Sequence, residues 1–191
     1  MNIGILGGAF NPPHIGHLLI ARQVLDFASP EQGRRIDEVW FVPSYGGHHL
    51  RSDVVSAEHR LAMLNLCSIP RTRVSTIEID HKLDGKTIHL LPYLPKEHVY
   101  TFIIGADWLP TFHKWERYQE LLKQISFLVI PRYGFANGPL YENMTVLQHS
   151  FLMTSDISAT KIRGRVKQGL PVDCFVPKGI AEYIEKNKLY L

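Results

Sequence analysis

Apolar positions along the chain follow two spacings, one typical of strands and one typical of helices. Short apolar or alternating runs predict strands at residues 3–6, 38–42, 73–79, 99–104, 127–130 and 146–153. After the first of these, helical spacing recurs at Leu18, Ala21, Leu25 and Ala28. Further helices are predicted after Ser56, over residues 116–123, and from about Ser158 and about Gly179.

The alternation of strands and helices predicts an α/β fold with a Rossmann-like, doubly wound parallel sheet and right-handed crossovers. The run 99–104 is almost continuously apolar, as in strands buried on both faces. No repeat, low-complexity segment or linker interrupts the chain, so one domain is expected over residues 1–191. Ligands of such sheets bind beyond the carboxyl ends of the strands, where the strand order reverses. Residues 7–17, 105–108 and 156–158 each follow a predicted strand and are expected to meet at one cleft.

The segment from Gly7 to His17 joins the first strand to the first helix through a turn rich in glycine and proline. It places His14 and His17 near the first turn of that helix. Helix N-termini attract phosphate through free N–H groups and the helix dipole, and imidazoles can donate to phosphate oxygens. We therefore predict a phosphate site. The alternatives are a surface pair without a role, or two metal ligands on one helical face, although no third ligand with suitable spacing is visible.

Three segments resemble a known enzyme family. The pattern Gly8-x-Phe10-Asn11-Pro12-x-His14-x-Gly16-His17 resembles the first phosphate motif of the HxGH nucleotidyltransferase superfamily. Residues 157–163 are similar to the second phosphate motif of that superfamily, and residues 103–107 with Trp115 resemble its central nucleotide-binding segment. The order and spacing of these segments, over nearly the whole chain, are most similar to those of bacterial nicotinate mononucleotide adenylyltransferases.

This resemblance implies transfer of the adenylyl group of ATP to nicotinate mononucleotide, which gives nicotinate adenine dinucleotide and pyrophosphate in NAD biosynthesis. It implies Mg²⁺ bound through the ATP phosphates, with no metal ligand from the protein. The implied catalytic residues are His14, His17 and Arg163. The residues implied to bind ATP are Gly7, Gly8, Phe10, Gly16, His17, Gly105, Asp107, Ile157, Ser158, Thr160 and Arg163. Those implied to bind the acceptor are Ala9, Thr87, Trp108, Trp115 and Arg132.

Several of these residues also have a purely structural interpretation. Ser158 can simply cap the start of a helix. Trp115 is implied to stack on the pyridine ring of the acceptor, but it could be a core anchor, and Trp108 could cover the cleft instead. Asp107 could hold the ATP ribose or cap its neighbours, and Arg132 could lie near the nucleotide or in solvent.

The chain departs from the family pattern after Pro43. A Pro-Pro-His-Lys or Pro-Pro-His-Arg loop is usual there, whereas this chain has Gly-Gly-His-His at residues 46–49. His49, when protonated, or Arg51 could supply the missing charge. The change leaves nicotinamide mononucleotide, or both mononucleotides, as alternative acceptors, and a nucleotide-binding protein without turnover as a rival of another class. A phosphopantetheine adenylyltransferase fits less well, because those chains lack the arrangement of residues 105–115.

Composition changes this picture little. The net charge of the 191-residue chain is +3 and its basic residues form no long run, so no nucleic-acid partner is expected. Cys67 and Cys174 are too few and too far apart for a disulfide scaffold or a zinc site. No leader precedes the first strand and no apolar stretch could span a membrane, so we expect a cytoplasmic protein without a membrane partner. The expected partners are ATP and nicotinate mononucleotide, and formation of a homo-oligomer stays open.

Overall fold

The computed structural model describes residues 1–32, 35–46, 53–67 and 69–191. Its centre is a six-stranded sheet in the order β3-β2-β1-β4-β5-β6, in which every neighbouring pair is parallel. The strands are β1 (Asn2–Gly8), β2 (Glu38–Pro43), β3 (Thr72–Val74), β4 (Val99–Gly105), β5 (Ser126–Ile130) and β6 (Met144–Val146). This is the order of a doubly wound sheet, which reverses between β1 and β4. The prediction of a Rossmann-like fold is confirmed.

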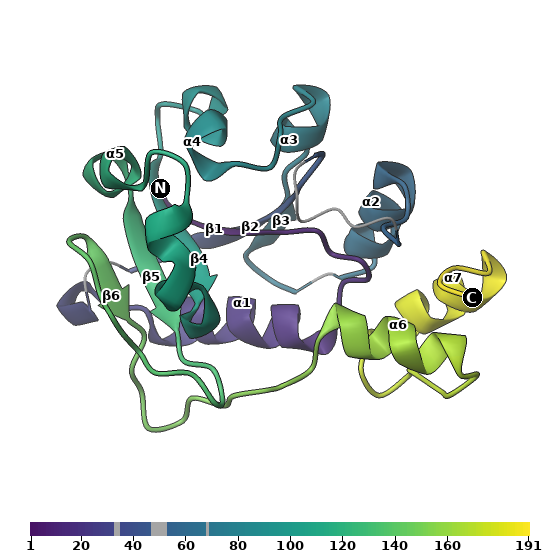
Figure 1. Ribbon diagram of the computed structural model, residues 1–191. Helices are drawn as coiled ribbons and strands as arrows, with labels where there is room; N and C mark the ends of the chain where they lie inside the picture. The colour runs from purple at the N-terminus through teal and green to yellow at the C-terminus, as the bar shows by residue number, and fades with distance from the viewer. Residues whose placement is uncertain (33–34, 47–52, 68) are drawn as a thin grey trace.

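Helices cover both faces of the sheet (Figure 1). The α-helices are α1 (Ile15–Phe27), α2 (Ala57–Asn65), α3 (Ile77–Asp80), α4 (Thr87–Leu90), α5 (Tyr118–Gln124), α6 (Ala159–Lys167) and α7 (Lys178–Lys186). The 3₁₀ helices of the described residues are η1 (Pro30–Gln32), η2 (Leu91–Tyr93) and η3 (Ala106–Lys114). Figure 1 shows α3, α4 and α5 on one side of the sheet and α1 on the other.

Side chains of the central strands alternate between two apolar layers. In β2, Trp40 and Val42 pack with residues of α4, α5 and η3, whereas Val39 and Phe41 pack with residues of α1. Strand β4 alternates in the same way. Burial of this apolar surface on both faces is the main force that holds the sheet between its helices.

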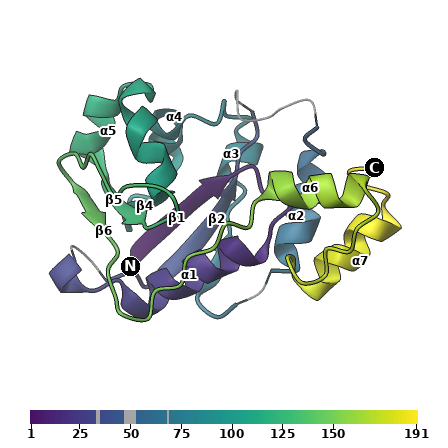
Figure 2. The same cartoon turned by 60° about the horizontal axis from the view of Figure 1, so that its bottom comes forward.

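A third apolar cluster joins α2, α6 and α7 to the end of the chain. Its buried members are Met63, Cys67, Ile162, Val172, Val176, Ile180, Ile184, Leu189 and Tyr190. Figure 2 shows these three helices grouped together with the C-terminus. The segment between α6 and α7 also reaches α1, because the N–H of Ile15 donates to the carbonyl of Phe175 (3.0 Å). The segment that precedes α7 therefore lies near the first turn of α1.

Two predicted strands are wrong over most of their length. Of residues 73–79, only 73 and 74 belong to β3, and α3 begins at residue 77. There Thr76 Oγ1 donates to Asp80 Oδ2 (2.6 Å) and the Thr76 carbonyl accepts from the Asp80 N–H (2.8 Å), local bonds that compete with strand pairing. Of residues 146–153, only 146 belongs to β6. Both β3 and β6 are edge strands, paired on one side only.

Other sequence predictions about local structure agree more closely. Ser56 caps α2, since its Oγ accepts from the N–H of His59 (3.5 Å). The helix predicted over residues 116–123 is α5, displaced toward the C-terminus. His49 and Arg51 lie outside the described residues. None of the described helices is long and apolar enough to cross a membrane.

Candidate active site

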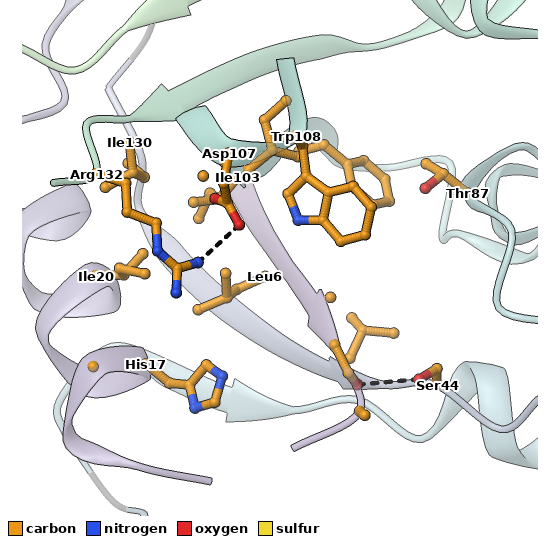
Figure 3. A pocket seen from close by; sticks show the side chains of 18 of the residues that line it. Leu6, His17, Ile20, Ser44, Thr87, Ile103, Asp107, Trp108, Ile130 and Arg132 are labelled. Carbon is orange, nitrogen blue, oxygen red and sulfur yellow. Dashed lines mark hydrogen bonds and ion pairs between the residues drawn. The ribbon is translucent and has the colours of Figure 1, made fainter. Parts of the chain in front are cut away.

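A cleft of about 980 Å³ opens at the carboxyl ends of β1 and β4, where the strand order reverses. Gly7 and Gly8 end β1 at this cleft, and Gly105 ends β4. The first turn of α1 and the start of α6 also line it. Figure 3 shows His17 and Arg132 projecting into this space. The three segments that were predicted to converge therefore do meet.

His14 and His17 lie against each other at the first turn of α1, with ring centroids 3.7 Å apart. Nδ1 of His17 accepts a hydrogen bond from the backbone N–H of His14 (3.1 Å). Because Nδ1 is an acceptor, a neutral His17 carries its proton on Nε2. His17 lines the cleft, so this Nε2–H is available there as a donor.

Burial keeps both imidazoles uncharged at neutral pH. The pKa of His14 is lowered to about 4, first by burial and then by the positive charge of Arg132. The pKa of His17 is lowered well below 6.5 by burial, and then by His14 and Arg132. Nδ1 of His14 is buried and has no hydrogen-bond partner among the described residues. Such an atom is rare in folded proteins, and a water or ligand in the cleft could supply its missing hydrogen bond.

Gly16 makes room for the ring of His14. A Cβ atom at this position would lie 2.9 Å from His14 Nδ1, too close for two non-bonded atoms. The same Cβ would lie 3.7 Å from the carbonyl of Ile157, so the first turn of α1 is adjacent to the segment that precedes α6. Any side chain at residue 16 would therefore displace His14.

Phe10 lies behind His17 and is not among the described residues that line the cleft. Its ring is buried, with a centroid 4.8 Å from that of His17 and 5.8 Å from that of Phe41. Ala9 does line the cleft. Its carbonyl accepts from Nη1 of the buried Arg60 on α2 (2.9 Å). This bond connects the turn to α2.

Asp107 and Arg132 form an ion pair inside the cleft (Figure 3). Arg132 Nη1 donates to Asp107 Oδ2 (2.9 Å), while Asp107 Oδ1 is buried without a hydrogen-bond partner among the described residues. Gly105 permits this arrangement, because a Cβ there would overlap Oδ1 of Asp107. The structure thus places Arg132 in the cleft, close enough to lower the pKa of both histidines.

The second phosphate motif reaches the cleft with its first residues only. Ile157 and Ser158 line it, and Ser158 caps α6 by accepting from the N–H of Lys161 (3.3 Å). Thr160 and Arg163 are not among the described lining residues. Arg163 is buried and donates to Asp53 and to the carbonyl of Asn11. The start of α6 is therefore in the cleft, and the guanidinium of Arg163 is not.

Two indoles line the cleft near η3. The ring centroids of Trp108 and Trp115 lie 5.6 Å apart at 81°. Trp115 is half-buried and packs on Phe112, with ring centroids 4.9 Å apart. It thus packs on the core and also lines the cleft, and stacking of Trp115 on the acceptor stays a prediction. Thr87, at the start of α4, also lines the cleft.

Comparisons with known proteins agree with this geometry. A family model described as cytidylyltransferase-like matches residues 5–165. A nicotinate-nucleotide adenylyltransferase of Bacillus subtilis is 34% identical, over 98% of this chain and 97% of its own. A probable nicotinate-nucleotide adenylyltransferase of Exiguobacterium sibiricum is 35% identical, over 100% of this chain and 99% of its own. The chain belongs to the nicotinate-nucleotide adenylyltransferase family.

Solved structures share the fold of this family member. The Plasmodium falciparum nicotinic acid mononucleotide adenylyltransferase complexed with NaAD superposes with a TM-score of 0.78 at 20% identity, over 99% of this chain and 97% of that one. A putative nicotinate-nucleotide adenylyltransferase from Vibrio parahaemolyticus gives a TM-score of 0.70 at 18% identity, over 99% and 94%. At these identities the likeness shows the fold.

Gln23 and Glu78 are among the cleft residues of this adenylyltransferase-family chain that the sequence did not predict. Gln23 is buried on α1, where its Nε2 donates to the carbonyl of Met153 (3.1 Å) and its Oε1 accepts from the N–H of the same residue (2.5 Å). The signal that could have identified Gln23 was its position as a polar residue within the apolar pattern of α1. Glu78 is buried on α3 and accepts from the N–H of Tyr45 (3.3 Å). Burial raises the pKa of Glu78. Its position in a wrongly predicted strand gave no sign that it lines the cleft.

A charged network borders the same side of the cleft as Thr87. Lys86 Nζ lies 2.7 Å from Glu116 and 3.3 Å from Asp84. His89 lies 3.0 Å from Asp84 and 3.2 Å from Glu116 through its two ring nitrogens. The network ties the start of α4 to the residue after Trp115. It also means that the charge of Lys86 is already compensated by carboxylates.

The cleft fits a metal carried by a ligand better than a metal held by the protein. The described residues contain no group of three or more His, Cys, Asp or Glu that could hold a metal ion. Among the carboxylates of the cleft, Asp107 pairs with Arg132 and Glu116 with Lys86. Enzymes that transfer phosphoryl groups in general use a divalent metal bound to the phosphate oxygens. The donor set of this family member is compatible with that arrangement.

Proposed function

We propose that this chain transfers the adenylyl group of ATP to nicotinate mononucleotide, the activity that the names of its relatives indicate. A 5′-phosphate oxygen of the acceptor forms a bond to the α-phosphorus of ATP, the bond from that phosphorus to the bridging oxygen breaks, and pyrophosphate leaves. The products are nicotinate adenine dinucleotide and pyrophosphate. The supporting observation is the pair of neutral imidazoles at a helix start, within a cleft at the reversal of the sheet.

Such a reaction needs positioning and charge stabilisation more than covalent work by the protein. We assign to His17 Nε2–H, with His14 beside it, donation to the phosphate oxygens that gain charge at the transition state. The start of α6, with Ile157 and Ser158, would face the same phosphates. Arg163, which the resemblance implied to be catalytic, acts in this proposal by holding the turn before His14.

The remaining cleft residues divide between the two nucleotides in this proposal. The ATP side comprises Gly7, Gly8, Gly16, Gly105 and Asp107, with Phe10 behind His17 and Thr160 beyond the cap of α6. The acceptor side comprises Ala9, Thr87, Trp108, Trp115 and Arg132. Flat apolar rings such as the indoles can stack on a pyridine ring.

We propose Mg²⁺ as the divalent ion, held through the ATP phosphates rather than by protein side chains. When bound, it would neutralise phosphate charge and orient the triphosphate. We further propose that residues 1–191 form one nucleotidyltransferase domain and that the protein works in the cytoplasm.

Release of pyrophosphate tests the proposed function directly. The wild-type chain is incubated with Mg·ATP and, separately, nicotinate mononucleotide, nicotinamide mononucleotide or phosphopantetheine. We expect rapid release with the nicotinate compound and none with phosphopantetheine. Absence of release with every acceptor, together with intact ATP binding, would instead indicate a nucleotide-binding protein without turnover.

Acceptor choice gives a quantitative prediction. We expect kcat/KM for nicotinate mononucleotide to exceed that for nicotinamide mononucleotide at least tenfold, equivalent to about 1.4 kcal/mol. Two N–H groups of the loops near the acceptor side already have partners: Gly46 donates to Leu83, and Lys86 to Asp84. Discrimination is therefore expected to depend on donors such as the Thr87 hydroxyl and on the balance of charge around Lys86.

The variant Lys86→Ala probes that balance. It leaves Asp84 and Glu116 without their ammonium partner, so the wall becomes more negative and the preference for the acid should decrease. Lys123→Ala removes an equal charge from the exposed end of α5 and should leave the preference unchanged. Competition between the two mononucleotides at fixed Mg·ATP measures both. Equal rates in the wild type would reject the acid as the preferred acceptor.

A further inference from the structure

Asn11, within the first phosphate motif, is an anchor rather than a ligand-facing residue. Its side chain is 2% exposed, and it is not among the described residues that line the cleft. Its Oδ1 accepts from the N–H of Val55 (3.1 Å) and its Nδ2 donates to the carbonyl of Asp53 (3.1 Å). Because donor and acceptor ends of the amide both have partners, the orientation of this side chain is determined. The residue lies three positions before His14.

Arg163 reaches the same turn from α6. Its Nη1 donates to the carbonyl of Asn11 (2.9 Å), and its Nε and Nη2 lie 2.8 Å and 2.7 Å from Asp53 Oδ2. The hydrogen bond from Arg163 lowers the pKa of Asp53, so this carboxylate is charged at neutral pH. The turn is therefore connected both to the segment before α2 and to α6.

Tyr190 supplies a further bond from the far end of the chain. Its hydroxyl donates to Asn11 Oδ1 (2.9 Å), across 179 positions in sequence. The side chain is 8% exposed and packs in the apolar cluster of α2, α6 and α7. Burial raises the pKa of Tyr190, so the phenol keeps the proton that it donates. Figure 2 shows how the C-terminal segment lies with α6 and α7 on this side of the molecule.

We infer that Tyr190 is a positioning residue for the phosphate site: its hydroxyl orients Asn11 and so holds the turn from which His14 and His17 project. This inference rests on the proposed function, because it assigns to these histidines the stabilisation of the reacting phosphate. Loss of the hydroxyl leaves a lone pair of the buried Asn11 amide unpaired and allows the turn to adjust. A small displacement of a group that stabilises a transition state lowers turnover more than it lowers substrate binding.

The test compares Tyr190→Phe with Tyr183→Phe. Each variant removes one phenolic hydroxyl from the C-terminal apolar cluster and keeps the ring. Tyr183 lies 3.0 Å through its hydroxyl from Nδ1 of His59 on α2, away from the turn of Asn11. Tyr183→Phe therefore removes a hydroxyl of the same cluster without touching the turn of Asn11, which makes it a control for loss of a cluster hydroxyl.

In Tyr190→Phe, kcat is expected to fall about fivefold or more, with KM for both substrates within about twofold of the wild type. In Tyr183→Phe, kcat should stay within about twofold. The side-chain nitrogen signals of His14 and His17, observed by NMR after histidine labelling with nitrogen-15, should move in the first variant only. Unmoved histidine signals in Tyr190→Phe, or equal changes in both variants, would overturn the inference. An inactive wild type would reject the proposed function instead, and the NMR comparison would still decide the role of Tyr190.

Discussion

Replacement of His17 by alanine is expected to lower kcat by about 100-fold or more, the scale of losing a preorganised donor to developing charge. The reason lies in the tautomer: the backbone N–H of His14 occupies Nδ1 of His17, so the proton of the neutral ring is on Nε2. His17 is half-buried in the wall of the cleft, where a hydrogen bond to a charged oxygen is stronger than in bulk water. Pyrophosphate release at saturating Mg·ATP and nicotinate mononucleotide measures the effect.

Two further variants separate chemistry from folding. His17→Gln keeps an N–H at a similar reach and should recover part of the lost turnover. His113→Ala removes an exposed histidine of η3 that is not among the described lining residues, and should leave kcat unchanged. Turnover close to that of the wild type in His17→Ala, with an unchanged circular dichroism spectrum, would remove His17 from the reaction.

The same two histidines should make the free protein sensitive to mild acid. The pKa of His14 is about 4 in the folded chain, against an ordinary histidine pKa of 6.5. Between these values the unfolded chain binds a proton that the folded chain does not, so the free energy of unfolding decreases as pH falls. From pH 7 to pH 5, His14 alone should lower it by about 2 kcal/mol, and His17, whose pKa is also lowered, should add to this.

Urea unfolding at pH 7 and pH 5 provides the measurement. The variant His14→Asn removes the titrating ring, so its stability should change less between the two pH values than that of the wild type. His113→Ala, which removes an exposed imidazole, should follow the wild type. An identical decrease in His14→Asn and in the wild type would show that other groups account for the acid sensitivity.

The central part of the fold could be predicted from the sequence for a simple physical reason. Strands β1, β2, β4 and β5 have neighbours on both sides, and their side chains pack against helices on both faces. Their apolar runs are therefore long and bounded by clear breaks, such as Pro43 at the end of β2 and Pro131 after β5. The turn between β1 and α1 was recognisable because glycine, proline and histidine stand together there.

The edges of the sheet could not be predicted in the same way. At β3 the β-branched residues 77 and 79 continue the strand pattern, yet the chain turns into α3. At β6 the alternating run extends to Met153, whose backbone N–H and carbonyl are both bound by the side chain of Gln23. In both places a local or side-chain partner replaces the neighbouring strand. Patterns of hydrophobicity do not contain that information.

The candidate site shows the same limit. The sequence predicted three parts of the cleft: the turn before α1, Gly105 with Asp107, and the start of α6. The contacts that hold them in place come from residues far away in sequence, such as Tyr190, whose partner is 179 positions distant. Arg163 illustrates the difference, since its motif position suggested a phosphate ligand and its side chain instead binds Asp53 and Asn11. Only the packed structure pairs such residues.

Two of the glycines that line the cleft, Gly16 and Gly105, affect how a map of mutational effects is interpreted. Gly16 lies under the ring of His14, and Gly105 under the carboxylate of Asp107, with no space for a Cβ atom at either position. In a saturation scan selected for growth on this activity, alanine at residue 16 or 105 should be depleted as strongly as substitutions of His14 and Asp107 themselves. Neither glycine offers a side-chain atom to a substrate. The positions most depleted of substitutions would thus include glycines against which a functional side chain packs, as well as the functional side chains themselves.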